Sequence, residues 1–211
     1  MRTTPALAAI ALAACATGCV GGLRDTDPGP LTYRVGAPEL VGGDALTADL
    51  VVARPESAPG LGVNRIATVW PGRRFDYYAG ARWAEELPLM VQSALVESLA
   101  GARRLRSVQG DLGRFRATHV LAVKVQSFEA DYGAGGVPVA RVALAVTLGR
   151  QSDRQVLASF TVAVEQAAAA NRLAEVVAAM DAAFGRAATE VATRSFDAIA
   201  ADLQAPANIR P

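Results

Sequence analysis

The chain has 211 residues, 52% of them hydrophobic, and its 21 basic and 20 acidic residues give a formal net charge of +1. Because positive and negative charges are nearly equal in number, the chain has no long-range attraction to nucleic acid, and a nucleic-acid partner is not expected. Both cysteines lie among the first 19 residues, so the rest of the chain can form neither a disulfide nor a thiolate metal site.

Residues 1–14 have the features of a secretory signal peptide. An apolar run from Pro5 to Ala14 follows a start with one positive charge, Arg2, and small residues precede Cys15. As a helix, this run would be only about 15 Å long, roughly half of the hydrocarbon thickness of a bilayer, so it cannot span a membrane permanently. Its removal takes away Arg2 alone among the charged residues and leaves a formal charge of zero.

The tetrapeptide Leu12-Ala13-Ala14-Cys15 resembles a bacterial lipobox, in which the cysteine thiol is acylated and becomes the new N-terminus. We therefore expect Cys15 to be lipidated. Each buried methylene contributes about 0.8 kcal/mol, so two or more acyl chains, such as palmitate, anchor a protein stably. Cys19 is the weaker candidate, because the residue three positions before it is Ala16 rather than a larger aliphatic.

The lipobox leads to an expected location at the periplasmic face of the cell envelope. Ala16, directly after Cys15, is not the aspartate that retains lipoproteins at the inner membrane, so that resemblance favours the outer membrane. The alternative is a soluble periplasmic protein whose signal peptide happens to contain a cysteine.

Residues 15–30 are expected to form the lipidated N-terminus and a flexible tether, because glycine and proline punctuate them and no apolar period survives. A single α/β domain is expected over residues 31–205, followed by a C-terminal tail over residues 206–211. The domain opens with predicted strands at Leu31–Val35, Leu46–Ala53 and Arg65–Trp70.

The first predicted helix runs from Trp83 to Ala102. Pro88 suits its first turn, where a missing N–H costs nothing. Apolar residues recur every fourth position and predict one stripe that packs on a sheet, with the polar residues facing elsewhere. The stripe is Leu87, Val91, Leu95 and Leu99, and the polar residues are Gln92, Glu97 and Ser98.

Three later segments alternate between apolar and other residues and predict strands, with Leu121–Val125, Val142–Leu148 and Val156–Val164 as their apolar stripes. Gly149–Arg154 is short enough to join the last two as an antiparallel hairpin. A long helix from Asn171, its expected cap, to about Leu203 closes the chain and packs on the sheet. The predicted fold class is α/β, with a mixed, largely antiparallel sheet and two principal helices.

The chain offers little catalytic chemistry. His119 is the single histidine, and its place at the start of a predicted strand favours a hydrogen-bonded structural role. A nucleophile elbow, a set of zinc ligands and a Walker pattern are all missing from the sequence. Gly133–Gly136 is interpreted as a loop between strands. We therefore expect no enzyme, no catalytic residues, no metal and no cofactor.

Several segments together resemble the ABC-type transport auxiliary lipoprotein family, and the resemblance covers most of the mature chain. They are Gly60-Leu61, Arg65-Ile66-Ala67, Phe75-Asp76-Tyr77-Tyr78 and Arg82-Trp83-Ala84-Glu85-Glu86-Leu87-Pro88, of which the last is the most specific. The chain departs from the family at Gly62-Val63, where Asp-Thr is common, and at Phe196, near a common late tryptophan.

The resemblance implies an accessory role in moving lipids or other hydrophobic molecules between envelope membranes. Its implied partners are an Mce-domain protein, a permease and an ATPase. A homo-oligomer is a further alternative. Two rival functions remain, an envelope scaffold and a lipid-binding carrier, of which the carrier requires an apolar cavity of several hundred Å³.

Candidate partner-binding residues are Tyr77, Tyr78, Arg82 and Trp83. Successive residues of a strand point to opposite faces, so one tyrosine is expected in the core and the other outward, where an aromatic ring makes a good interface anchor. For Arg82 and Trp83 the alternative is structural, with Trp83 covering the edge of the core and Arg82 paired with a carboxylate.

Overall fold

The computed structural model describes residues 29–111, 116–133 and 135–205. The predicted signal peptide, Cys15, Cys19 and the C-terminal tail lie outside these residues. Within them, no helix combines the length and the apolar character needed to cross a bilayer.

The sheet is organised around one long strand, β7 (His119–Asp131). One edge of β7 pairs antiparallel with β8 (Val139–Arg150), which pairs antiparallel with β9 (Val156–Ala167). These are the two longest pairings of the sheet. They confirm the predicted hairpin after Leu148 and follow from the alternation of apolar residues along all three strands.

The other edge of β7 pairs with three shorter strands in turn, all of them parallel to it. They are β2 (Leu46–Val52), β3 (Glu56–Ser57) and β4 (Arg65–Trp70).

Three further strands complete this half of the sheet. A short 3₁₀ turn, η1 (Pro71–Arg73), leads from β4 into its antiparallel partner β5 (Arg74–Trp83). Beyond them, β1 (Leu31–Tyr33) runs parallel to β5, and β6 (Leu105–Gly110) runs parallel to β2. Over the described residues the result is a mixed sheet of nine strands, and the predicted α/β fold class is confirmed.

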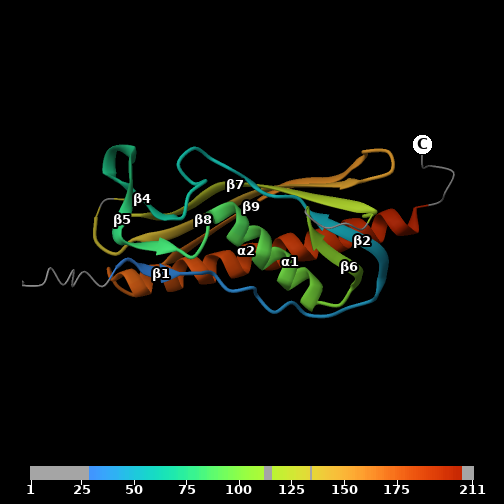
Figure 1. Cartoon of the computed structure of the whole chain (residues 1–211), viewed down its shortest axis with the longest axis horizontal. Coiled ribbons are helices and arrows are strands. Elements are labelled where there is room, and N and C mark those ends of the chain that lie inside the picture. Colours follow the sequence, from blue (N-terminus) through green and yellow to red (C-terminus); the bar gives the residue numbers. More distant parts are fainter. Residues whose placement is uncertain (1–28, 112–115, 134, 206–211) are drawn as a thin grey trace, which may run out of the picture.

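Both helices cover the same face of this sheet (Figure 1). α1 (Leu87–Gly101) packs on β2 and β6, and α2 (Leu173–Gln204) runs along β7, β8 and β9. The predicted stripes of both helices point into a single core, in which Leu95, Met180 and Phe184 are fully buried. Burial of each such side chain contributes about 1.5–3 kcal/mol, so the packing of the helices on the sheet contributes strongly to stability.

The first helix differs from its prediction at the start and on its polar side. Residues up to Trp83 continue β5, and the Trp83 N–H donates to the Asn64 carbonyl oxygen at 2.8 Å, so α1 begins only at Leu87. Gln92 and Ser98, expected to face away from the core, are buried. The Gln92 Nε2 donates to the Val52 carbonyl oxygen at 2.9 Å and to the Asp111 Oδ1 at 3.0 Å, which gives both of its N–H groups a partner.

The second helix begins two residues later than predicted. Arg172 is its N-cap and makes no side-chain cap bond, so the expected cap by Asn171 is wrong. The Asn171 Oδ1 instead accepts a hydrogen bond from the Tyr132 hydroxyl at 3.0 Å. A tertiary contact with the residue that follows β7 has therefore replaced the local capping bond.

Candidate partner-binding surfaces

Trp83, at the end of β5, is fully buried. Its ring meets the Phe128 ring edge-on, with the centroids 5.7 Å apart and the planes at 85°. In this position the indole fills the core between the sheet and α2, where Phe128 also contacts Phe184. Trp83 therefore packs in the core and is not accessible to a partner.

Arg82 points to the opposite side of β5 and is exposed. Its Nε donates to the Thr32 Oγ1 at 3.4 Å, a long bond to the neighbouring strand β1. The guanidinium thus remains accessible to a partner, although it lies at the edge of the molecule formed by β1.

Tyr77 is half-buried against the loop that precedes β4. Its hydroxyl donates to the Gly60 carbonyl oxygen at 2.9 Å, the Arg65 guanidinium lies 4.0 Å above its ring, and Phe75 meets it edge-on. Gly60 has a positive φ of 86° and leaves no room for a Cβ, which would lie 2.8 Å from the Phe75 ring. This glycine allows the loop to close over both rings.

Tyr78 points to the other face, as the alternation along a strand predicts. Its hydroxyl lies 2.7 Å from the Tyr132 hydroxyl, which bonds to Asn171 at the start of α2. Burial, together with this hydrogen bond, raises the pKa of Tyr78 well above its ordinary value. The two tyrosines, Arg82 and Trp83 therefore do not form one surface.

A different surface is open on the sheet. In the part of the chain that the structure describes, no helix covers the face of β7, β8 and β9 opposite α2, as Figure 1 shows. The residues there form two rows across the three strands, Lys124–Ala145–Thr161 and Ala122–Thr147–Ser159. Their side chains are short apart from that of Lys124, so the floor is low.

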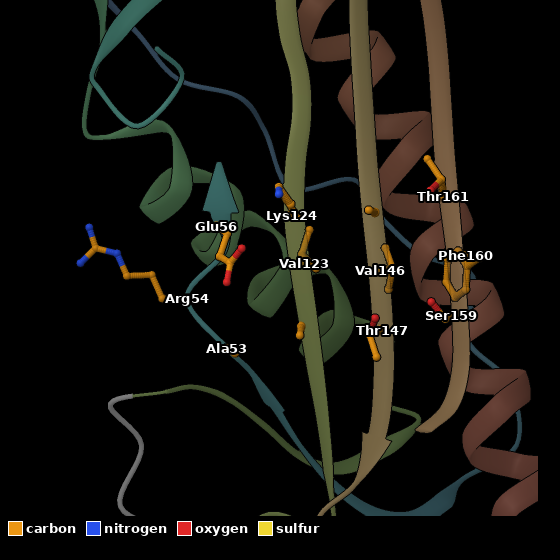
Figure 2. Close-up of a pocket in the computed structure, with 12 residues that line it drawn as sticks. Ala53, Arg54, Glu56, Val123, Lys124, Val146, Thr147, Ser159, Phe160 and Thr161 are labelled. Carbon is orange, nitrogen blue, oxygen red and sulfur yellow. The ribbon is translucent and has the colours of Figure 1, made fainter. Parts of the chain in front are cut away.

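This floor is part of a groove of about 660 Å³, drawn in Figure 2. Its other side is formed by Ala53 and Arg54, directly after β2, and by Glu56 of β3. Arg54 points away from the strands in Figure 2, and its Nη2 bonds to the Glu86 Oε2 at 2.7 Å. The groove therefore combines a floor of small side chains with the charged groups of Lys124 and Glu56.

Lys124 is the single lysine of the chain; every other basic residue except the histidine is an arginine. It is exposed, and it forms no ion pair among residues 29–111, 116–133 and 135–205. An unpaired ammonium on a low floor can reach a carboxylate or a carbonyl oxygen of a bound protein segment. The alternation along residues 121–125 predicts that Lys124 lies opposite the apolar stripe, but nothing else in the sequence marks it as a binding residue.

A second hollow, of about 540 Å³, lies at the start of β7. His119 is buried there, and its Nε2 lies 3.2 Å from the Asp202 Oδ2, near the end of α2. The other Asp202 oxygen accepts from Arg150 at 3.0 Å, and Arg150 also pairs with Asp153 at 3.1 Å. This network ties α2 to the sheet, so the placement of His119 matches the predicted hydrogen-bonded structural role.

Two carboxyl groups have pKa values shifted in opposite directions. The bonds from Arg106 and then from Ser107 lower the pKa of Asp49 on β2. Burial raises the pKa of Glu129 on β7, only partly opposed by a bond from the Phe128 N–H. Neither lies in the groove. Within the described residues, no group of three or more histidine, cysteine or acidic side chains is arranged to hold a metal.

Comparison with known proteins identifies related sequences and folds. The family model described as ABC-type transport auxiliary lipoprotein component matches residues 34–192. A crystal structure of a DUF330 protein from Xanthomonas campestris is similar with a TM-score of 0.75 and 25% identity, and the match covers 82% of this chain and 99% of that one.

A protein from Chlamydia trachomatis shares the fold with a TM-score of 0.52 and 10% identity, over 72% of this chain and 98% of that one. No curated protein matches the sequence.

Proposed function

Since the chain belongs to the family of ABC-type transport auxiliary lipoprotein components, we propose that it serves a transporter as a periplasmic component that acts through protein–protein contacts. The observation that carries this proposal is the extent of the match, because residues 34–192 include every strand from β2 onward, α1 and more than half of α2. The family relation thus concerns most of the folded unit rather than a local motif.

The proposed anchor is a lipid on Cys15, and the proposed membrane is the outer membrane. Cys15 and Ala16 carry this part of the proposal from the sequence. If Cys19 were acylated instead, the tether between the lipid and β1 would be only four residues shorter. Mass spectrometry of the mature N-terminus distinguishes the two sites.

The proposed partners are an Mce-domain protein, a permease and an ATPase, and the proposed cargo is lipid or another hydrophobic molecule. Within this assembly we assign the groove on the bare sheet face as the contact with the Mce-domain protein. The unpaired Lys124 and the low floor of alanine, serine and threonine support this assignment, because a partner can approach the strands closely there.

A lipid-binding carrier is the less favoured function. Such a protein would bury acyl chains in a largely apolar cavity. Arg54, Glu56 and Lys124 contribute to the larger hollow, and Arg116, His119, Arg150 and Asp202 contribute to the smaller one. Charged groups that line both hollows would have to lose water beside an acyl chain, which is unfavourable.

The experiment is affinity purification of the full-length, membrane-anchored protein from cross-linked envelopes, followed by identification of the captured proteins. The proposal predicts an Mce-domain protein among them, together with its permease and ATPase. Extraction and mass spectrometry of bound lipid test the carrier function on the same sample. Recovery of stoichiometric lipid without any transporter component would contradict the proposal.

A further inference from the structure

The turn between β4 and β5 carries exposed arginines beside aromatic rings. We call residues Trp70–Phe75 the hairpin tip. Gly72 and Arg73 have positive φ values of 76° and 63°. An arginine rarely adopts this left-handed backbone conformation, which costs some strain. The turn nevertheless holds Arg73 in an exposed position.

The chemistry of the hairpin tip is that of a membrane-interface anchor. The Arg74 guanidinium lies 5.2 Å from the Trp70 ring centre, and the Trp70 ring stacks on Tyr132 at 4.1 Å. Phe75 is 40% exposed. Tryptophan, phenylalanine and arginine together suit the boundary between headgroups and acyl chains.

The nearby carboxylates do not neutralise the two arginines. Among the described residues, Arg73 and Arg74 form no ion pair, whereas Asp131 pairs with Arg141. Asp76 accepts a hydrogen bond from the backbone N–H of Tyr77 at 2.8 Å. The hairpin tip therefore presents two cations that lack a carboxylate partner in the described structure.

The hairpin tip lies at the end of the molecule where the described chain begins. Figure 1 shows the turn after β4, the connection from β7 to β8 and the start of β1 at one end of the long axis. Two more exposed apolar residues lie at this end, Leu31 on β1 (58%) and Val137 in that connection (50%). The chain that precedes β1, including Cys15, therefore joins the domain at this end.

We propose that the hairpin tip rests on the anionic lipid surface of the membrane that holds the anchor. This inference depends on the lipid anchor of the proposed function. Each arginine close to an anionic surface contributes about fivefold in affinity, so two contribute about thirtyfold. Because the tether makes this contact intramolecular, a preference of that size is sufficient to orient the domain. The long axis then points away from the membrane, and the groove lies along its side.

The experiment uses the full-length mature lipoprotein in nanodiscs made with dibrominated phosphatidylcholine, with or without phosphatidylglycerol. Bromine quenches tryptophan fluorescence on contact, and the chain contains only Trp70 and the fully buried Trp83. We expect quenching with phosphatidylglycerol, its loss in high salt, and no quenching in Trp70→Phe. The double variant Arg73→Glu/Arg74→Glu should lose the quenching.

A matched control comes from the opposite end of the molecule. Arg103 and Arg154 are also exposed arginines with positive φ, at 53° and 61°, and Arg103→Glu/Arg154→Glu should leave the quenching unchanged. Arg73→Gln/Arg74→Gln repeats the test if the charge reversal unfolds the protein.

If the wild-type protein co-elutes with nanodiscs but its tryptophan quenching is no greater than that of Trp70→Phe, the membrane contact is contradicted and the anchor is not. One that fails to enter nanodiscs contradicts the anchor and, with it, the membrane contact. The capture of transporter components is measured separately and does not depend on either result.

Discussion

The two faces of the strands β7, β8 and β9 share one backbone and differ in what they carry. The face toward α2 is apolar, and many of its large side chains are fully or nearly fully buried, such as Leu121, Leu144 and Val162. On the opposite face, the rows through Ala145 and Thr147 consist of short side chains apart from that of Lys124, and all of them are exposed or half-buried. Adjacent residues of these strands thus belong to one buried surface and one accessible surface.

This difference between the two faces separates residues that stabilise the fold from residues that are accessible to a partner. Packing against α2 stabilises the fold, so a change on the buried face alters the free energy of unfolding. A change on the bare face removes few contacts within the chain, so it should alter the binding of a partner and leave folding nearly unchanged. The predictions below test this separation.

The largest effect is expected on the buried face. Phe184→Ala removes a fully buried ring that contacts Phe128, and it should lower the free energy of unfolding by about 3–5 kcal/mol. Thr147→Ala on the bare face should change it by less than about 0.5 kcal/mol. Urea denaturation of both variants checks the contrast, and equal losses would show that the two faces are not distinct.

Substitutions in the network at the end of α2 should lower the free energy of unfolding almost as much. Asp202→Ala removes one of the two carboxylates that pair with Arg150 and the carboxylate beside His119, so we expect a loss of about 3 kcal/mol. His119→Gln keeps a polar group there and should cost about 1 kcal/mol. Partner capture should persist in His119→Gln when it is measured below its melting temperature. A specific loss of capture in this variant would assign the histidine a functional role.

Groove substitutions should act on binding. Lys124→Glu places a repulsive charge on the floor and should weaken partner affinity by about thirtyfold, roughly 2 kcal/mol. Its melting temperature should stay near that of the wild type. The same charge reversal at Arg103, an exposed residue outside the groove, is the control. Equal affinities of the two variants would remove the groove from the interface.

The tyrosines of β5 provide a comparison with the groove. Tyr77→Ala and Tyr78→Ala each lose a hydroxyl bond and ring contacts inside the domain, so both should lower the melting temperature. If either ring also anchors the partner, affinity should fall by about thirtyfold in that variant while it remains folded. A pull-down of the Mce-domain protein, with thermal denaturation alongside, separates the two roles.

The smallest effects depend on pH. The lowered pKa of Asp49 means that its bond to Arg106 stabilises the fold at neutral pH and is lost as the pH falls through the folded pKa. Asp49→Asn should therefore be less stable than the wild type at neutral pH, by below about 1 kcal/mol because Arg106 is largely exposed.

The pKa of Glu129 is shifted in the opposite direction, so its effect on stability has the opposite sign. Its raised pKa means that the charged form destabilises the fold at neutral pH, and this cost disappears as the pH falls through the folded pKa. Glu129→Gln should be neutral or slightly stabilising at neutral pH. As the pH falls through the acidic range, the free energy of unfolding of each variant, measured by urea denaturation, should approach that of the wild type. A constant difference at every pH would contradict the assigned pKa shifts.

Regular patterns made much of the fold predictable. Alternation identified β7, β8 and β9, and the spacing of apolar residues identified α2. Of β5, only Tyr77 and Tyr78 are treated as strand residues in the prediction, because Arg74–Trp83 mixes exposed charges, aromatic rings and a glycine without alternation, and the predicted helix starts at Trp83. β6 was missed because Leu105–Gly110 is short and only half-buried.

The groove could not be recognised as a site from the sequence, because it brings together the chain after β2, β3 and one face of three later strands. A usable signal was present. Small residues stand opposite the apolar stripes of β7, β8 and β9, and the single lysine lies among them. Alternation predicts which side chains share a face, but only the pairing of the strands shows that Lys124, Ala145 and Thr161 are neighbours.

The most direct test of the bare face as the partner contact is amine labelling of the lipid-anchored protein, free and in complex with the Mce-domain protein. Lys124 is the single lysine, so labelling with an amine-reactive ester reports on the groove alone once the α-amino group is excluded by peptide mapping. We predict that Lys124 reacts readily in the free protein and at least about tenfold more slowly in the complex, as expected for a side chain inside an interface that excludes water. An unchanged rate in a fully formed complex would contradict the assignment.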